Sequence, residues 1–322
     1  MVIERRSIGS LEASVVGVGC NQFGPTVDQR TCTEIVRSAL DLGINFFDTA
    51  DEYGPEGVSE EYVGQALRGR RDEAVVATKF GHHMDGDPQR GGASARWIVR
   101  AVEDSLRRLG TDRIDLYQQH FPDPAVEPEE TLVALDQLVR SGKVRHAGVC
   151  NLDAGAIQLR CDLARTRDIS GPVSAQNRYN LLRQETGDEI VPVLEANHLV
   201  LLPFFPLASG MLSGKYLPGQ PLPADSRFAR HLPPEQARRI VDRDAPAVAR
   251  LAGWATARDR SVAELAIAWL ASQPIVASVI AGVTTLEQLK ANARTAEWVL
   301  TPEEVDEVAA LARGGAGAAA DS

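Results

Sequence analysis

The sequence is poor in cysteine. Its 322 residues include only four, at positions 20, 32, 150 and 161. None of them forms a C-x-x-C pair, which argues against zinc ribbons and dithiol redox motifs, and their irregular spacing does not indicate a disulfide framework. We therefore expect reduced thiols and a cytoplasmic protein.

Excess positive charge and long apolar runs are also lacking. The formal net charge is −10, so no basic surplus is available for nucleic acid or for an anionic membrane surface. The most apolar stretch, residues 199–212, is short and is broken by two prolines. The first ten residues carry charges but no apolar core, so we expect no secretory signal. We expect neither nucleic acid nor a membrane as a partner, and nothing in the sequence fixes the oligomeric state.

What the sequence does contain is a repeated alternation of β-like runs and amphipathic helical stretches. The runs that predict strands are residues 15–19, 45–48, 74–79, 114–118, 146–149, 173–175, 199–204 and 277–280. The stretches that predict helices are residues 31–42, 59–67, 94–109, 128–139, 153–164, 189–196, 262–271 and 286–293. This spacing predicts parallel βαβ units, and eight of them make a (β/α)8 TIM barrel of the α/β class.

A few segments lie outside the eightfold pattern. Residues 2–6 and 11–14 predict an N-terminal β-hairpin that closes the bottom of the barrel. Residues 245–258 and 302–311 predict extra C-terminal helices. The proline- and arginine-rich segment 216–244 predicts a long loop over the active face.

The domain organisation follows from this pattern. We expect residues 1–313 to form a single barrel domain. Residues 314–322 are small and offer almost no side chains to pack, so we expect a disordered tail.

Helix boundaries carry local signals. Ser261 and Glu264 fit a capping box, and Ser59 stands before two acidic residues as a candidate helix start. Gly110 follows Leu109 as a helix stop.

Ionisable side chains stand at or just after the ends of the predicted strands: Asp48, Tyr53, Lys79 and His120. In a parallel barrel the C-terminal strand ends meet at one face, so these residues can lie together. Asp48 would hold the Lys79 ammonium, which in turn would lower the pKa of the Tyr53 phenol. A phenol so placed can protonate a carbonyl oxygen that His120 orients, which predicts carbonyl reduction with Tyr53 as general acid.

Each of these residues has an ordinary structural alternative. Tyr53 could pack in a loop, Asp48 could cap a turn, Lys79 could reach water from a strand end, and His120 could be purely structural. An unpaired carboxylate at a buried strand end is costly, however, and this cost favours pairing of Asp48 with Lys79.

The chain resembles the aldo-keto reductases, and the resemblance extends beyond these residues. The matching blocks are 48–54 (DTADEYG), 78–80 (TKF), 148–151 (GVCN), 176–180 (QNRYN), 205–210 (FPLASG) and 281–288 (AGVTTLEQ), followed by Asn292. They occur in the family's order, from about residue 15 to about residue 292. The resemblance implies NAD(P)H-dependent reduction of an aldehyde or ketone, a small-molecule carbonyl substrate, to an alcohol.

The resemblance also implies which residues hold the cofactor. Asn151 and Gln176 would hydrogen-bond the nicotinamide carboxamide, with Cys150 standing where the family commonly has serine, and Phe204 would stack under the ring. The residues implied for the pyrophosphate loop are Phe205, Pro206, Leu207, Ser209, Gly210 and Lys215, and those for the adenosine end are Gly282, Thr284, Gln288 and Asn292. A plain flexible loop remains the alternative for the pyrophosphate segment.

The implied cofactor is NADPH, with NADH possible. Many relatives carry an arginine or lysine that pairs with the 2′-phosphate, whereas this chain has Gly282, Thr284 and Gln288 at those positions. Discrimination between the two cofactors should therefore be modest.

Other readings of the sequence stay open. Gly17 and Gly19 suggest a Rossmann fingerprint, but Gln22 occupies the third glycine position. His82 and His83 are adjacent and so point apart, which does not favour a metal site or a metal-dependent hydrolase. A cofactor-binding regulatory or sensor subunit of the same fold, with slow turnover, is the principal alternative to an enzyme.

Overall fold

The computed structural model describes residues 3–82, 90–216, 220–223 and 226–314. His83, most of the predicted tail and parts of the two loops that follow β5 and β9 lie outside the described residues.

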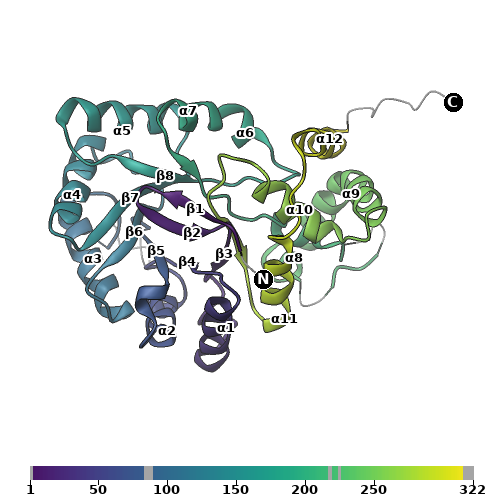
Figure 1. Ribbon diagram of the computed structural model, residues 1–322, viewed down its shortest axis with the longest axis horizontal. Helices are drawn as coiled ribbons and strands as arrows, with labels where there is room; N and C mark the ends of the chain where they lie inside the picture. The colour runs from purple at the N-terminus through teal and green to yellow at the C-terminus, as the bar shows by residue number, and fades with distance from the viewer. Residues whose placement is uncertain (1–2, 83–89, 217–219, 224–225, 315–322) are drawn as a thin grey trace.

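A sheet of eight parallel strands forms the centre of the molecule (Figure 1). The strands are β3 (Val16–Gly19), β4 (Phe46–Asp48), β5 (Val75–Phe80), β6 (Ile114–Gln119), β7 (Val144–Cys150), β8 (Pro172–Gln176), β9 (Val200–Leu201) and β10 (Val279–Gly282). Their order is β10-β3-β4-β5-β6-β7-β8-β9. Parallel bridges between Leu201 and Val276 and between Phe204 and Ile280 connect the two ends of the sheet. The predicted (β/α)8 barrel is confirmed, although β9 is much shorter than the predicted strand at 199–204.

Helices surround this sheet, as Figure 1 shows. They are α1 (Gln29–Asp41), α2 (Val58–Ala66), α3 (Ala95–Leu109), α4 (Pro128–Arg140), α5 (Ala154–Arg167), α6 (Glu185–Glu189), α7 (Val191–Ala196), α8 (Arg227–His231), α9 (Pro234–Thr256), α10 (Val262–Ala271), α11 (Leu286–Thr295) and α12 (Pro302–Arg313). Short 3-10 turns are η1 (Pro55–Gly57), η2 (Arg71–Glu73) and η4 (Ala208–Ser213). None of the helices in the described part of the chain is both long and apolar enough to cross a membrane.

Local sequence fixes most helix ends. The Ser261–Glu264 capping box is present at the start of α10, and Gly110 ends α3 in the left-handed conformation, both as predicted. Ser59, in contrast, is not a helix cap, because α2 begins after Gly57 and the Ser59 hydroxyl donates to the Cys20 carbonyl at 2.9 Å. A buried acceptor on a neighbouring segment has outweighed the local capping preference.

The first strand of the N-terminal hairpin begins three residues later, and ends two residues later, than predicted. It consists of β1 (Arg5–Ile8) and β2 (Leu11–Ser14), which pair in antiparallel fashion. Gly9 in its turn has a φ of 59°, and a Cβ there would come within 2.6 Å of the His146 ring, so only glycine fits. Ile8 and Leu11 are buried against the barrel interior, where they plug its lower end.

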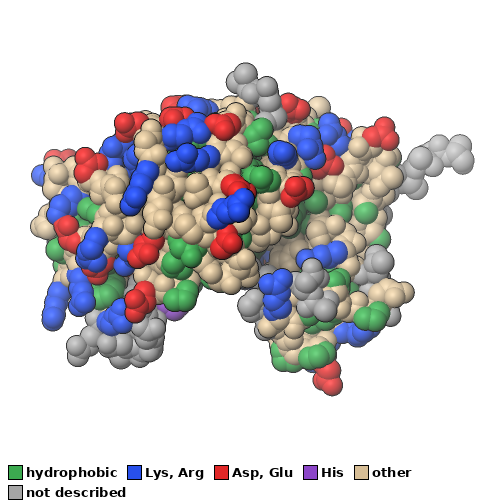
Figure 2. Space-filling view, turned by 90° about the horizontal axis from the view of Figure 1, so that it is seen from below, with side chains coloured by type: hydrophobic (Ala, Val, Ile, Leu, Met, Phe, Trp, Pro, Cys, Tyr) green, Lys and Arg blue, Asp and Glu red, His purple; other side chains and the backbone are tan. Residues whose placement is uncertain are grey.

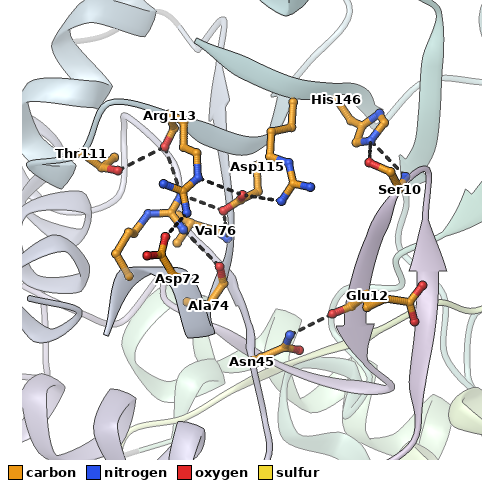
Figure 3. A network of polar contacts seen from close by, with 12 residues as sticks. Ser10, Glu12, Asn45, Asp72, Ala74, Val76, Thr111, Arg113, Asp115 and His146 are labelled. Carbon is orange, nitrogen blue, oxygen red and sulfur yellow. Dashed lines mark hydrogen bonds and ion pairs between the residues drawn. The ribbon is translucent and has the colours of Figure 1, made fainter. Parts of the chain in front are cut away.

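The lower end of the barrel is also held by a polar network, drawn in Figure 3. Asp115 of β6 is 1% exposed and accepts from Arg71 at 2.7 Å and from the Val76 amide at 2.9 Å. Arg145 lies 3.4 Å from its other oxygen. One carboxylate therefore links β6 to β5, β7 and the η2 turn.

The prediction of a loop over 216–244 is wrong in its second half. α8 and α9 occupy residues 227–231 and 234–256. Ala237, Val241, Ala245 and Val248 are buried at helical spacing on one face of α9. The prolines of this segment predicted a loop, but Pro233 and Pro234 stand at the N-cap and the first position of α9, where proline is tolerated.

Candidate active site

The four predicted catalytic residues meet at the C-terminal end of the barrel. Asp48 ends β4, Lys79 lies near the end of β5, His120 follows β6, and Tyr53 lies in the turn after β4. Lys79 Nζ donates to Asp48 Oδ2 at 2.7 Å and lies 3.4 Å from the Tyr53 hydroxyl. It also donates to the Thr49 carbonyl at 2.8 Å. The Lys79 and Asp48 side chains are 0% and 3% exposed, so this is a buried ion pair with a phenol at its edge.

Two glutamines complete the hydrogen bonding of Asp48. Its Oδ1 accepts from Gln176 Nε2 at 2.8 Å and from Gln118 Nε2 at 3.3 Å. The sequence reasoning assigned Gln176 to the cofactor and missed Gln118. A signal for Gln118 was present, because it lies near the C-terminal end of the predicted strand 114–118, two residues before His120.

The pKa shifts within this group have clear causes. Burial is the largest influence on the pKa of Lys79 and would lower it, but Asp48, Tyr53 and Cys150 together hold that pKa above its usual value, so the side chain remains an ammonium. Burial raises the pKa of the Tyr53 phenol, and Lys79 opposes that rise without cancelling it. Lys79 thus acts in the expected direction, while the net effect is a phenol that keeps its proton at neutral pH.

His120 is a neutral imidazole. It is 6% exposed, and burial together with the positive charge of Lys79 lowers its pKa to about 2. Its ring stacks on Phe121 at a centroid distance of 4.5 Å and meets the Tyr53 ring edge-on at 5.8 Å. A neutral imidazole of fixed orientation can donate one hydrogen bond to a carbonyl oxygen.

Glu52 is a site residue that the sequence reasoning missed. Its Oε1 lies 3.3 Å from His120 Nδ1, without the alignment of a hydrogen bond, and its Oε2 lies 2.9 Å from His82 Nδ1. Burial raises the pKa of Glu52. The only sequence signal was its position directly before Tyr53, and that position does not reveal two distant histidine neighbours.

Asn151, Gln176 and Cys150 lie at the same end of the barrel as these residues. Asn151 has a φ of 57° and donates from Nδ2 to the His120 carbonyl at 2.9 Å. Gln176 likewise directs its nitrogen at the protein, toward Asp48. Each amide can therefore offer its oxygen to the N–H groups of a carboxamide. Cys150 is buried, and burial raises the pKa of its thiol.

The segment after β9 has an unusual backbone, with several residues in the left-handed region. Phe205, Ala208 and Ser209 have φ values of 54°, 47° and 58°, which are uncommon for residues with a side chain. Gly210 follows at 94°, and a Cβ there would come within 3.0 Å of Lys215 Cε. Consecutive turns of this kind gather backbone amides around an anion. Lys215 adds an exposed ammonium beside them.

The other residues predicted to bind the cofactor here belong to the same segment. Phe204 is half-buried and its ring lies edge-on to Phe205 at 5.1 Å. Pro206 is buried, and Leu207 accepts from the Gly210 amide at 2.8 Å.

The residues predicted for the adenosine end lie around the start of α11. The Thr284 amide and hydroxyl both donate to Gln288 Oε1, at 2.8 and 3.0 Å. The Thr284 hydroxyl hydrogen is thus already used within the protein, and the amide nitrogens of Gln288 and Asn292 are the side-chain donors that remain. Gly282 and Gln288 are exposed, and Asn292 is half-buried.

Two further features bear on the site: possible metal ligands and the distribution of surface charge. Within the described residues there is no group of three or more His, Cys, Asp or Glu side chains that could hold a metal ion. Figure 2 shows a face that is hollowed between two lobes, with acidic and basic side chains interspersed across it.

The comparisons with known proteins cover nearly the whole chain. Residues 15–313 match the model of the Aldo/keto reductase family. The sequence is 37% identical over 296 residues to a probable voltage-gated potassium channel subunit beta of Oryza sativa subsp. japonica, covering 90% of this chain and 89% of that protein. It is 34% identical over 305 residues to the aldo-keto reductase YhdN of Bacillus subtilis, covering 92% and 89%.

A solved structure agrees with these sequence matches. The holo form of the aldo-keto reductase AKR11C1 from Bacillus halodurans is similar in fold, with a TM-score of 0.76 and 29% sequence identity. The similarity covers 98% of this chain and 99% of that one.

Proposed function

The chain belongs to the aldo/keto reductase family, and from this membership we propose that it reduces an aldehyde or ketone to an alcohol with NADPH, with Tyr53 as general acid. The observation that carries the proposal is the buried Asp48–Lys79 pair with the Tyr53 hydroxyl 3.4 Å from the ammonium. A bound nicotinamide would supply the hydride, which no side chain can provide.

The protein's own residues would handle the proton. His120 would hold the carbonyl oxygen by a hydrogen bond from its neutral ring, beside Tyr53. As hydride reaches the carbonyl carbon, the oxygen gains negative charge and takes the phenolic proton, which gives the alcohol. Lys79 stabilises the phenolate that remains, and Asp48 keeps Lys79 charged.

The cofactor would lie across the C-terminal strand ends. Asn151 and Gln176 would bind the carboxamide, Phe204 would stack on the ring, and the turn at η4 with Lys215 would hold the pyrophosphate. We propose NADPH because the family prefers this cofactor. We propose that its margin over NADH is small, because none of Gly282, Thr284, Gln288 and Asn292 is a cation that could pair with the 2′-phosphate.

A cytoplasmic location belongs to the same proposal. The four cysteines are free and buried, which suits a reducing compartment.

A regulatory subunit that binds cofactor and turns over slowly is the second candidate. One relative carries the name of a probable potassium channel β-subunit. Asp48, Tyr53, Lys79 and His120 are all present in this chain and lie together, and for that reason we prefer the enzyme.

The test is a panel of aldehydes and ketones assayed with NADPH and with NADH by loss of absorbance of the reduced cofactor. We expect steady multiple turnovers on at least one carbonyl, faster with NADPH. A single burst of oxidation followed by negligible turnover on every carbonyl would favour the regulatory subunit.

A further inference from the structure

Glu52 lies between two imidazoles beside the proposed catalytic group. Its carboxyl oxygens are 3.3 Å from His120 Nδ1 and 2.9 Å from His82 Nδ1. The side chains of Glu52, His120 and His82 are 20%, 7% and 45% exposed. Phe121 stacks on His120 and meets His82 edge-on at 5.5 Å, so the rings are held in place by packing as well as by charge.

A neutral imidazole carries one proton, so only one of its two nitrogens can donate. If His120 carries its proton on Nδ1, it can donate to an ionised Glu52, and Nε2 is then only an acceptor. If the proton is on Nε2, the Nδ1 lone pair faces Glu52 Oε1. That arrangement is favourable only when the Glu52 carboxyl itself holds a proton and donates it.

We propose that Glu52 is a positioning residue that selects the tautomer of His120, an inference that rests on the proposed carbonyl reduction. Protonated Glu52 donates to His120 Nδ1 and leaves Nε2–H as the donor for the carbonyl oxygen. When Glu52 is ionised, the imidazole proton moves from Nε2 to Nδ1 and donates a hydrogen bond to the carboxylate, and the Nε2 lone pair then repels that oxygen. Reduction is therefore fastest at pH values where Glu52 is protonated.

The groups around Glu52 set the pH at which the His120 tautomer changes. Burial is the largest influence and raises the pKa of Glu52, while His82 and Lys79 act in the opposite direction. Asp51, next in sequence, is buried, and burial together with Glu60 and Glu52 raises its own pKa. Asp48 and Tyr53, which also lie nearby, are held to Lys79. The tautomer change should thus occur at a pH above the usual pKa range of glutamate, and removing His82 should move it to still higher pH.

The direct test reads the tautomer without any substrate. Full-length protein labelled with 15N-histidine is studied by long-range 1H–15N correlation from about pH 5 to about pH 9, with His120 assigned by its loss in His120→Gln. We expect wild-type His120 to pass from Nε2–H to Nδ1–H as pH rises, while remaining neutral. In Glu52→Gln one tautomer should persist at every pH, and in His82→Leu the change should occur at higher pH. A single wild-type tautomer throughout, or the same change in Glu52→Gln, would overturn the proposal.

The kinetic test uses the best carbonyl of the panel. We expect wild-type kcat/KM to fall about tenfold as pH rises through this change, and the profile of Glu52→Gln to lack that limb. A limb that persists unchanged in Glu52→Gln would contradict the role of Glu52. If wild type reduces no carbonyl, the proposed function fails, and the spectra alone decide whether Glu52 controls the tautomer.

Discussion

At the scale of single residues, one buried ammonium organises the candidate site. Lys79 is fully buried, and Asp48 keeps it charged, while Gln118 and Gln176 hold Asp48 in place. Removing any member leaves a buried polar group without its partner, which costs more than the bond itself contributes. We therefore expect a large loss of activity from substitutions that keep the volume of a side chain and remove its charge.

Tyr53→Phe removes the proposed acid and keeps the ring. We expect kcat to fall about a hundredfold or more, because a lost general acid usually costs that much, while cofactor binding stays nearly unchanged. Steady-state rates and a fluorescence titration of cofactor measure the two effects. Wild-type turnover in Tyr53→Phe would remove Tyr53 from the mechanism.

Lys79→Met removes the charge that opposes the burial of Tyr53. The pKa of the phenol should then rise further above its usual value, so it becomes a weaker acid. We expect kcat to fall by about a hundredfold and the alkaline limb of reduction to move to higher pH. Lys79→Arg, which keeps the charge, is the matched control and should retain more activity. Weaker cofactor binding with an unchanged pH profile would assign Lys79 another role.

At the scale of elements, the two ends of the barrel have different tasks. The C-terminal end of the strands carries the proposed chemistry. At the lower end, Asp115 joins neighbouring strands and the N-terminal hairpin closes the barrel (Figure 3). Substitutions at the lower end should act on stability and leave kcat nearly unchanged.

Asp115→Leu tests the lower end. It leaves Arg71 and the Val76 amide without their shared acceptor, and we expect the free energy of unfolding to drop by about 2–3 kcal/mol. Denaturant titration measures the loss. Asp72→Leu, which removes an exposed partner of Arg113, is the control and should change stability little. Equal effects of the two substitutions would show that burial of Asp115 does not matter.

The start of α11 governs the proposed cofactor preference. Thr284→Arg replaces a hydroxyl that is occupied by Gln288 with a cation. If residue 284 faces the 2′-phosphate, NADPH should bind about tenfold more tightly and NADH about as before. Paired titrations measure both constants. Equal tightening of both cofactors, or none, would show that residue 284 faces elsewhere.

At the scale of the whole molecule, the proposed cofactor residues come from distant parts of the chain. They extend from β7 through η4 to α11, across the place where isolated bridges between Leu201 and Val276 and between Phe204 and Ile280 close the barrel. A ligand that contacts both sides of this place should stabilise the closed barrel.

Thermal unfolding tests this coupling. At a concentration about 100 times its Kd, NADPH should stabilise the fold by about 2.7 kcal/mol. For a chain of this length that is a rise in Tm of about 4 °C. Phe204→Ala, at the same concentration, should reduce the rise, because it removes the proposed stacking surface. A full rise in Phe204→Ala would place the nicotinamide away from residue 204.

Much of the architecture could be predicted because its signals are local. The alternation of strands and helices, the Ser261–Glu264 capping box and the Gly110 helix stop each depend on residues a few positions apart. The same holds for Asp48 and Lys79, since a charged side chain at the end of an apolar run must find a partner. Where a local signal was ambiguous, as at Pro233 and Pro234 at the start of α9, the prediction failed.

The sequence by itself therefore determined the (β/α)8 barrel and the face on which Asp48, Tyr53, Lys79 and His120 would meet. Only the tertiary structure decided which further residues contact them. Gln118 and Gln176 reach Asp48 across 70 and 128 residues of chain, and Glu52 meets His82 and His120 from two other loops. The physical reason is that hydrogen bonds and burial depend on distances in space, and the closure of the barrel sets those distances.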